Sequence, residues 1–371
     1  VRRLRLAQGR MERPWRWCDW MDCVHHWPAM PPSSPRPLKV SLINSLPIEG
    51  FYSLESYFKR IRKSLEALGV EVSNNTSPYA SQGLLQRLKI VRFARRHQAD
   101  INHITGDIHF AAFGTDPART VVTVADCGRL HQLRGLKREV LRQFWFQLPL
   151  QHAAAITVIS QAVKDDLLAW VPSLPAERVH VVPVSISPQF SETPKPFSAN
   201  HIRILQVGST PNKNIPRLVQ ALHGLDCTLV VIGRLSPELV EMMNEQQIRF
   251  ENHWGISEAE VFAHYQQADL VTFASTLEGF GMPILEAQSV GRPVVTSSMC
   301  SMPDVAGGAA ELVDPLSVAS IRSGIERVIG DAAYRDRLIR LGKQNIRRFN
   351  SDTIAAQYLA IYRSVLGSAA A

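Results

Sequence analysis

The sequence of 371 residues lacks long apolar segments and is poor in cysteine. No uninterrupted apolar run approaches the ~18 residues that a membrane-spanning helix needs, so we predict no transmembrane helix. The five cysteines are odd in number and scattered, which disfavours a disulfide framework and favours reduced thiols in the cytoplasm. They are Cys18, Cys23, Cys127, Cys227 and Cys300.

Acidic residues are also in deficit. The chain has 41 Lys and Arg against 33 Asp and Glu, and its formal net charge is +8 at pH 7. Such a balance favours anionic partners, namely nucleotides, nucleic acid or a membrane surface. No recognised nucleic-acid-binding motif is present, and the aromatic residues of the basic segments recur at the spacing of a helix core. We therefore expect no nucleic-acid partner.

Most of the chain alternates between predicted strands and helices, which indicates βαβ units and parallel sheets. One series occupies residues 38–185 and a second occupies residues 201–350, with a Ser- and Pro-rich linker at 186–200. Residues 1–37 show no periodicity, and we interpret them as a disordered extension. A last helix is expected within 351–371. Two such α/β domains would place a cleft between the carboxyl ends of their sheets, where ligands bind in open α/β folds.

The most informative stretch joins a predicted strand at 270–274 to a helix through the loop Ser275–Met282, which contains Glu278, Gly279, Phe280 and Gly281. Pro283 suits the first turn of that helix, because its missing N–H would have no partner there in any case. Two glycines before a helix N-terminus favour an anionic or hydroxylated ligand, since free amides and the helix dipole face it. Glu278 and Glu286 would be out of place beside phosphate unless they accept hydrogen bonds from sugar hydroxyls.

The segment Glu278–Glu286 resembles the E-x7-E signature of the family 4 glycosyltransferases. Val207–Asn214 is similar to the phosphate-binding turn of that family, and Trp254–Ser257 and Ser301–Asp304 add support. The resemblance extends over residues 38–366 and is strongest in the second half. It implies the GT-B fold, an α/β architecture of two Rossmann-like domains that face a central cleft. It also implies that the C-terminal helix crosses back to the first domain.

The resemblance further implies roles for individual residues. The Lys213 ammonium would neutralise a leaving diphosphate, Glu278 would hold donor sugar hydroxyls, and Glu286 would hold the ribose. The implied catalytic residues are Lys213, Glu278 and Asp126; the implied donor-binding residues are Gly208, Ser209, Asn214, Trp254, Gly279, Phe280, Gly281, Met282 and Glu286; the implied acceptor-side residues are Gly50, Asp107 and His109.

Structural explanations compete with several of these roles. Lys213 could be a solvated lysine, although a cation at a helix start opposes the helix dipole. Glu286 could be an exposed helix residue, although its neighbours are apolar and a buried unpaired carboxylate would be costly. Trp254 could serve packing alone, and Asp107 and His109 could belong to a plain polar turn.

The family implies a retaining transfer of a sugar from a nucleoside-diphosphate-sugar donor to a hydroxyl of a glycan or lipid-linked acceptor. Such a reaction would serve the synthesis of cell-surface polysaccharide or glycoconjugates. No cofactor and no metal are expected, because amides and cationic side chains would hold the diphosphate. The sequence agrees, since it has no DxD-like pair in a suitable loop and no standard zinc spacing.

One position departs from the family pattern. Relatives carry His-Asp at the end of the strand that here ends in Val124, and this chain has Ala125-Asp126. The departure makes one alternative to a transferase credible, namely a catalytically impaired sugar-nucleotide-binding or membrane-binding module. A sugar-nucleotide epimerase of the same fold is a second alternative.

Two basic segments of the first domain predict a membrane contact. A helix over residues 83–97 carries five Lys and Arg, and a helix over residues 136–148 combines basic residues with Leu, Val and aromatics. This pattern is typical of helices that lie on anionic membranes. A solvated basic face beside a core face is the alternative. We therefore expect a cytoplasmic protein, with a peripheral position at the inner face of the membrane as a hypothesis.

Overall fold

The computed structural model describes residues 36–46, 53–198 and 200–369. Residues 38–371 form one compact unit. Gly50 and residues 1–35 of the expected extension lie outside the described residues. Within the described ranges no helix is long and apolar enough to cross a bilayer.

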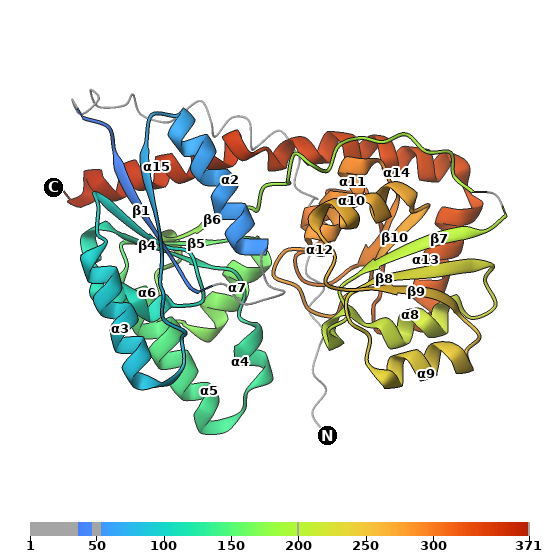
Figure 1. Cartoon of the computed structure of the whole chain (residues 1–371), viewed down its shortest axis with the longest axis horizontal. Coiled ribbons are helices and arrows are strands. Elements are labelled where there is room, and N and C mark those ends of the chain that lie inside the picture. The colour runs from blue at the N-terminus through green and yellow to red at the C-terminus, as the bar shows by residue number, and fades with distance from the viewer. Residues whose placement is uncertain (1–35, 47–52, 199, 370–371) are drawn as a thin grey trace, which may run out of the picture. The chain divides into compact units, whose positions relative to one another are not determined.

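The first half of the compact unit contains a parallel sheet with the strand order β2-β1-β3-β4-β5-β6 (Figure 1). Every residue of β3, β4 and β5 is buried, and these strands are rich in Ile, Val and Thr. Such continuous burial is typical of parallel strands that are covered on both faces. The strands are β1 (Lys39–Asn44), β2 (Glu71–Thr76), β3 (Ile101–Ile104), β4 (Thr120–Val124), β5 (Ala155–Val158) and β6 (Val179–Val181).

Helices connect these strands in the manner of βαβ units. The α-helices are α2 (Ser53–Ala67), α3 (Gly83–Arg96), α4 (Gly128–Gln132), α5 (Gly135–Leu141), α6 (Leu148–His152) and α7 (Gln161–Trp170). Short 3-10 helices lie at η2 (His109–Gly114), η3 (Pro117–Arg119) and η5 (Ala176–Arg178), and a π-helix lies at η4 (Arg142–Gln147).

The second half contains another parallel sheet, with the order β12-β11-β10-β7-β8-β9. Its strands are β7 (Ile202–Val207), β8 (Cys227–Ile232), β9 (Arg249–His253), β10 (Leu270–Phe273), β11 (Val294–Ser297) and β12 (Glu311–Val313). Its helices are α8 (Ile215–Leu222), α9 (Pro237–Glu245), α10 (Glu258–Gln267), α11 (Met282–Val290), α12 (Met302–Ala306), α13 (Val318–Gly330) and α14 (Ala332–Asn345), with 3-10 turns at η6 (Pro211–Lys213) and η7 (Ile346–Phe349). The expectation of two parallel α/β sheets is confirmed.

The last helix, α15 (Ser351–Ala369), packs against helix α2 of the first half. The Tyr57 and Tyr358 hydroxyls lie 3.1 Å apart, and His103 Nδ1 lies 2.7 Å from the Tyr362 hydroxyl. Burial lowers the pKa of His103 to about 3, so the ring is neutral and each of its nitrogens bonds to a hydroxyl. These satisfied polar groups attach the end of the chain to the first sheet.

Each sheet has one pair of neighbouring strands whose following connections lead to opposite sides of the sheet. Ligands bind at such switch points in α/β folds. In the first sheet this switch point lies between β1 and β3. In the second sheet it lies between β7 and β10. The loops that follow these four strands are therefore the places where the fold itself predicts a site.

The helix expected over residues 136–148 is present as a continuous helical segment over residues 135–152, but its middle part is a π-helix rather than an α-helix. The π-helix interrupts the segment before Pro149. Pro149 has no backbone N–H, so the Trp145 carbonyl loses the donor that an α-helix would supply. His109 Nδ1 takes that place at 2.9 Å. Single π-turns are frequent at functional sites.

Candidate active site

Lys213 and Glu278 form an ion pair at the switch point of the second sheet. Lys213 ends the short turn after β7, Glu278 lies in the loop after β10, and Lys213 Nζ lies 2.6 Å from Glu278 Oε1. The side chains are only 16% and 14% exposed, so solvent screens the two charges little and their attraction is stronger than it would be in water. The structure thus brings together two residues that the sequence separates by 65 positions.

The glycine before this lysine is required by the geometry. Gly208 has a φ of +89°, and a Cβ added to it would lie 2.6 Å from Lys213 Cε. The lysine side chain therefore lies across the bare backbone of Gly208. Its ammonium also lies 4.6 Å from the centre of the Phe273 ring, which favours a cation there.

Neighbouring side chains hold the glutamate loop in place. Asn212 Nδ2 donates to the Leu277 carbonyl at 2.9 Å and to Glu278 Oε1 at 3.1 Å. The Ser301 hydroxyl lies 2.6 Å from the Phe280 carbonyl and 3.2 Å from the Glu278 carbonyl. No described residue accepts a hydrogen bond from the Gly279, Phe280 or Gly281 amide. The loop carbonyls thus already accept hydrogen bonds, whereas the three amides can donate to a ligand. Such amides suit an anion or a hydroxyl oxygen.

Glu286 lies in α11 and is a partly buried carboxylate. The Tyr265 hydroxyl of α10 donates to its Oε2 at 2.6 Å. Burial, with a smaller contribution from the charge of Glu258, raises the pKa of Glu286 to about 7 against the opposing effects of Tyr265, Arg60 and Lys213. A carboxylate that titrates near neutral pH and has one free oxygen is typical of a binding site rather than of a solvated helix surface.

Asn214 is part of the framework of the turn. It has a left-handed backbone with a φ of +62°, which Asn tolerates better than most residues. Its buried amide donates to the Ala274 carbonyl at 3.1 Å and to the Pro315 carbonyl at 2.6 Å. The side chain therefore ties the turn after β7 to the end of β10, and its donors are already used.

Three other expected donor residues surround this core. The Ser209 hydroxyl donates to the Arg234 carbonyl at 2.7 Å, so it bridges the ends of β7 and β8. Trp254 is 59% exposed and follows β9. Met282 is the first residue of α11, directly after Gly281, whose φ of +113° requires glycine.

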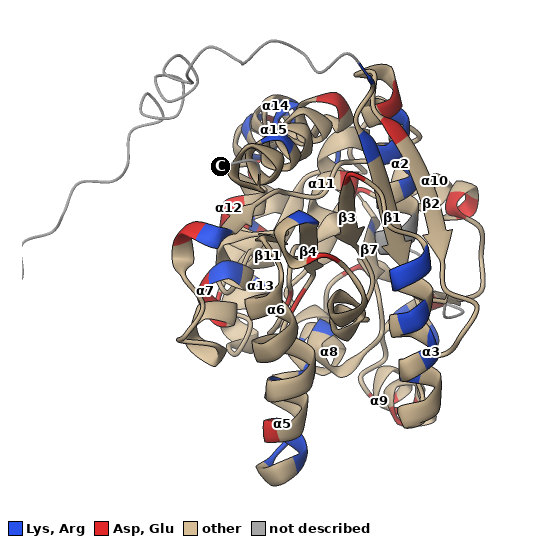
Figure 2. Ribbon diagram, turned by 90° about the vertical axis from the view of Figure 1, so that its left-hand side faces the viewer, with Lys and Arg blue, Asp and Glu red and all other residues tan. Residues whose placement is uncertain are grey.

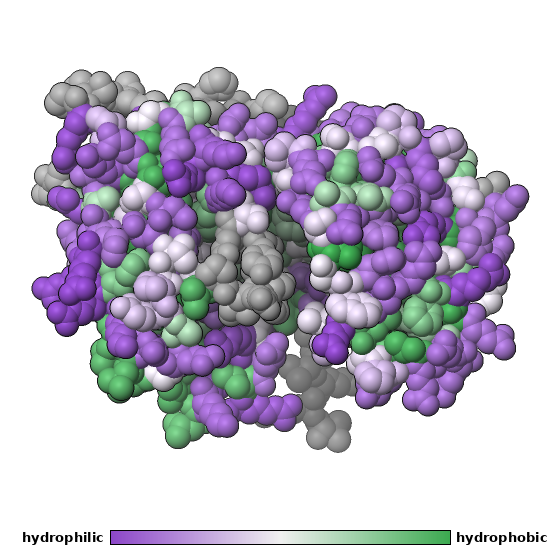
Figure 3. Space-filling model, in the orientation of Figure 1, coloured by the Kyte–Doolittle hydropathy of each residue, from purple (hydrophilic) through white to green (hydrophobic). Residues whose placement is uncertain are grey.

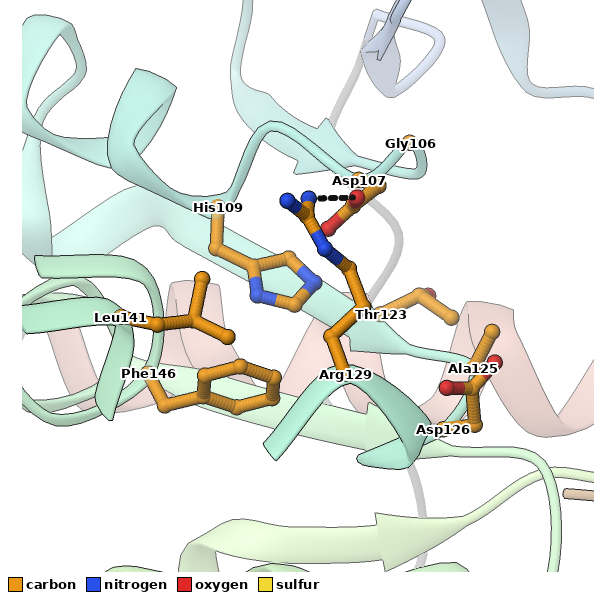
Figure 4. A pocket seen from close by; sticks show the side chains of 9 residues that line it. All are labelled: Gly106, Asp107, His109, Thr123, Ala125, Asp126, Arg129, Leu141 and Phe146. Atoms are coloured by element: carbon orange, nitrogen blue, oxygen red, sulfur yellow. Dashed lines mark hydrogen bonds and ion pairs between the residues drawn. The ribbon is translucent and has the colours of Figure 1, made fainter. Parts of the chain in front are cut away.

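The first half contributes a cavity of about 180 Å³ at the carboxyl ends of β3 and β4 (Figure 4). Arg129 of α4 and Asp107 both line it and form an ion pair of 3.3 Å. Asp126 and His109 also line it, so the structure brings three of the expected residues to one cavity. The lining residues are Gly106, Asp107, His109, Thr123, Ala125, Asp126, Arg129, Leu141 and Phe146.

His109 is a buried wall of this cavity. Its Nδ1 faces the Trp145 carbonyl, which can only accept, so that nitrogen carries the proton. Burial lowers the pKa of His109, and the charge of Asp107 opposes that shift. The imidazole is therefore a neutral, fixed group.

The donor loop touches the first half directly. The Ser160 hydroxyl donates to the Gly279 carbonyl at 2.7 Å, and a Cβ added to Gly279 would lie 2.5 Å from the Ala125 carbonyl oxygen. Asp126 lies at the same contact, where its carboxylate accepts from the Gly128 amide at 2.7 Å. The position that departs from the family pattern thus packs its backbone against the donor loop.

Sequence reasoning missed two residues of this region. Ser160 carries a cap signal, and its hydroxyl does accept from the Val163 amide, but no local pattern reveals its contact with Gly279. Arg60 of α2 is near Glu286, since the attraction of Glu258 and Glu286 opposes the burial that lowers the pKa of Arg60. Only the packing of α2 brings that cation there. Among the described residues, no group of three or more His, Cys, Asp or Glu side chains converges as a metal site would require.

Two family models match the chain in succession. The model described as Glycosyltransferase Family 4 matches residues 54–190, and the model described as Glycosyl transferases group 1 matches residues 191–345. The chain is a family 4, group 1 glycosyltransferase. The resemblance seen in the sequence is confirmed at the level of the family.

Relatives of this glycosyltransferase include two mannosyltransferases. It is 26% identical over 259 residues to MMP alpha-(1->4)-mannosyltransferase of Mycolicibacterium hassiacum, covering 64% of this chain. It is 28% identical over 261 residues to O-antigen chain mannosyltransferase B of Escherichia coli, covering 67% of this chain. The matches span only 62% and 61% of the lengths of those relatives.

Solved structures show the fold. HepE of Anabaena, solved in complex with UDP and glucose, is 18% identical with a TM-score of 0.71, covering 88% of this chain and 100% of that one. Sucrose-phosphate synthase of Thermosynechococcus elongatus is 16% identical with a TM-score of 0.70, covering 89% and 100%. The expected GT-B fold is confirmed.

Proposed function

We propose that this glycosyltransferase moves a sugar from a nucleoside-diphosphate-sugar to a hydroxyl of a glycan or lipid-linked acceptor, with retention at the anomeric carbon. The Lys213–Glu278 pair beneath the unoccupied loop amides carries this proposal. A cation for a diphosphate and a carboxylate for sugar hydroxyls lie side by side, as a nucleotide sugar needs. The HepE complex with UDP and glucose supports a nucleotide ligand, and the two mannosyltransferases make a mannose donor the first to test.

The chemistry assigned to the donor side is charge stabilisation. The bond between the anomeric carbon and the diphosphate oxygen breaks, and Lys213 stabilises the negative charge that develops on that oxygen. Glu278 and the amides of the loop hold the sugar hydroxyls. Glu286 accepts from the ribose hydroxyls through the oxygen that Tyr265 leaves free. No step requires a protein nucleophile.

The acceptor side supplies position. The cavity lined by Asp107, His109 and Asp126 would hold the acceptor, with Arg129 bonding its polar groups. The acceptor oxygen bonds to the anomeric carbon on the face from which the diphosphate departs, and its proton passes to the departing phosphate oxygen. Fixed positions for both partners remove much of the entropic barrier. The synthesis of cell-surface polysaccharide or glycoconjugates is the process we assign to this reaction.

The donor model has a direct test. A thermal-shift screen of nucleoside diphosphates and their sugars identifies the donor, since a ligand that binds only the native state raises its stability. Transfer from that donor should be lost in Lys213→Ala and in Glu286→Ala while the fold is kept. Full activity in either variant would contradict the donor-site assignment. Activity should also survive EDTA, because we propose that neither a metal nor another cofactor takes part.

Ala125 favours a second candidate, a sugar-nucleotide-binding module with impaired turnover. Its carbonyl packs against Gly279, and its methyl group provides no polar atom near the donor. Transfer and donor hydrolysis by the unaltered protein decide between the two. Binding without turnover, with turnover restored by Ala125→His, would establish the binding module, and conversion of the free donor to its epimer would indicate an epimerase.

A further inference from the structure

Large apolar side chains protrude from the surface of the first half, on α3 and on the segment formed by α5 and the π-helix. Leu84 and Leu85 in the first turn of α3 are 72% and 76% exposed, Leu136 in α5 is 79% exposed, and Phe144 in the π-helix is 52% exposed. Apolar colour gathers over α3 and α5 in Figure 3. Exposed apolar groups at such density mark an interaction site.

Basic residues accompany these apolar groups (Figure 2). Helix α3 carries five Lys and Arg and no acid. Its exposed face begins with leucines and ends with Arg92, Arg95 and Arg96. Arg134 directly precedes α5, and Lys137 lies on it next to Leu136; the one acid of α5, Glu139, is paired with Arg142 at 2.6 Å. The surface therefore combines leucine side chains with uncompensated positive charge.

The two segments belong to one surface. The Arg87 guanidinium of α3 stacks over the Trp145 ring of the π-helix, with its carbon 4.3 Å from the ring centre. The π-helix buries Trp145 and Phe146 and leaves Phe144 outside. Burial in the core thus explains the inward aromatics of the π-helix, but it does not explain the outward leucines of α3 and α5.

We propose that this surface, formed by the exposed faces of α3, α5 and the π-helix, docks onto an anionic lipid bilayer. Leucine and phenylalanine side chains enter the boundary between headgroups and acyl chains, and arginines and lysines meet the anionic headgroups. Each such basic residue adds to the attraction toward an anionic membrane. A second copy of the chain fits less well, because two like-charged faces would meet. Nucleic acid provides no apolar surface for the leucines.

Two elements of the docking surface also contribute buried residues to the acceptor cavity. Leu141 ends α5 and Phe146 lies in the π-helix, and both line that cavity. Docking would therefore bring the cavity close to the lipid headgroups, as an acceptor held in the membrane requires. This last step rests on the proposed function, whereas the docking itself does not.

Vesicle flotation tests the docking without any assay of transfer. The full chain is mixed with vesicles of phosphatidylcholine alone or of phosphatidylcholine with phosphatidylglycerol, at low and at high salt. We expect binding to the anionic vesicles only, with loss at high salt. No binding, or equal binding to both vesicles, would overturn the proposal.

Matched variants assign the binding to this surface. One triple variant removes the apolar anchors and carries Leu84→Ser, Leu85→Ser and Leu136→Ser. A second removes three charges and carries Arg92→Gln, Arg95→Gln and Arg96→Gln. Each triple variant should bind the anionic vesicles at least about tenfold more weakly. Leu312→Ser with Leu316→Ser, exposed apolar positions of the second half, should leave that binding unchanged. Circular dichroism verifies folding.

Three results would refute the assignment to this surface. Unchanged vesicle binding in both triple variants is the first. The second is light scattering that shows a dimer of the unaltered protein and a monomer of the triple leucine variant. The third is binding of a DNA duplex without binding of vesicles.

Discussion

The two parallel sheets of this protein place their candidate sites differently. In the second sheet, the loops after β7 and β10 flank the switch point and supply Lys213 and Glu278 in direct contact. In the first sheet, the switch point lies between β1 and β3, and a Cβ on Gly106 would lie 2.6 Å from the Ser45 hydroxyl. The described cavity has instead formed one strand further along, at the ends of β3 and β4.

This difference shows how each half obtains its chemistry. The donor half uses two short segments, each with its own recognisable sequence pattern, and the strand order places them side by side. The acceptor half depends on contacts between residues that are distant in the sequence. Pro149 leaves the Trp145 carbonyl without its helical donor, and His109 donates to that carbonyl instead. Four predictions, in order of decreasing effect, test whether the donor half controls the reaction and how the first half supports it.

The largest effect is expected for Lys213→Ala, which removes the cation of the donor half. Loss of a group that stabilises transition-state charge costs about 100- to 1,000-fold in turnover. Initial transfer rates measure it. Lys343→Ala, at an exposed ion pair with Glu192, is the matched control and should retain its rate. Equal rates in the two variants would remove Lys213 from the mechanism.

The next effect tests the contact between the halves at Gly279. In Gly279→Ala the new methyl group would meet the Ala125 carbonyl, which is backbone and cannot turn aside. The donor loop must move, and a shift of about 1 Å costs up to about 100-fold in rate. Gly330→Ala meets nothing within 4 Å and should be neutral. Normal turnover in Gly279→Ala would show that activity does not require the close contact between Gly279 and the Ala125 carbonyl.

Glu286→Gln sharpens the comparison through pH. The pKa of Glu286 is about 7 in the folded protein against 4.5 as its ordinary value, so the folded state binds more protons between these pH values. Stability therefore falls as pH rises through that window, by roughly 3 kcal/mol at most. Gln carries no charge there and should stabilise the protein at pH 8 but not at pH 5.

Donor binding should respond in the opposite sense. The ionised carboxylate accepts hydroxyl bonds best, so nucleotide affinity of the unaltered protein should rise through about pH 7. In Glu286→Gln that affinity should be about tenfold lower and flat with pH. Thermal denaturation and titration calorimetry measure the two effects. A pH-dependent affinity in the variant would assign the titration to another group.

The smallest effect is expected for Ser160→Ala, which removes the hydrogen bond from the first half to the Gly279 carbonyl. Such a bond contributes about 1 kcal/mol, so turnover should fall several-fold. The helix cap of α7 is lost as well, at a cost of about 1 kcal/mol of stability. Ser236→Ala loses a comparable cap in α9 and serves as control. If both variants lose turnover equally, the Ser160 bond does not position the loop.

Much of the second half could be predicted from sequence. Glycines, a proline and two glutamates stand at fixed spacing around one predicted helix, so the pattern is local. The first half was harder to predict, because Asp107, His109 and Asp126 are separated by helices and share a cavity only after the sheet forms. The π-helix could not be predicted, because its wider turn depends on Pro149 and on the distant His109.

The sequence by itself determined the alternation of strands and helices, the parallel sheets and the loop before α11. It did so because periodicity, glycine and proline act over a few residues. Only the tertiary structure decided that Lys213 pairs with Glu278, that Tyr265 bonds Glu286, and that Ser160 bonds Gly279. Those contacts depend on strand order, and strand order is set by how two sheets bury their apolar faces.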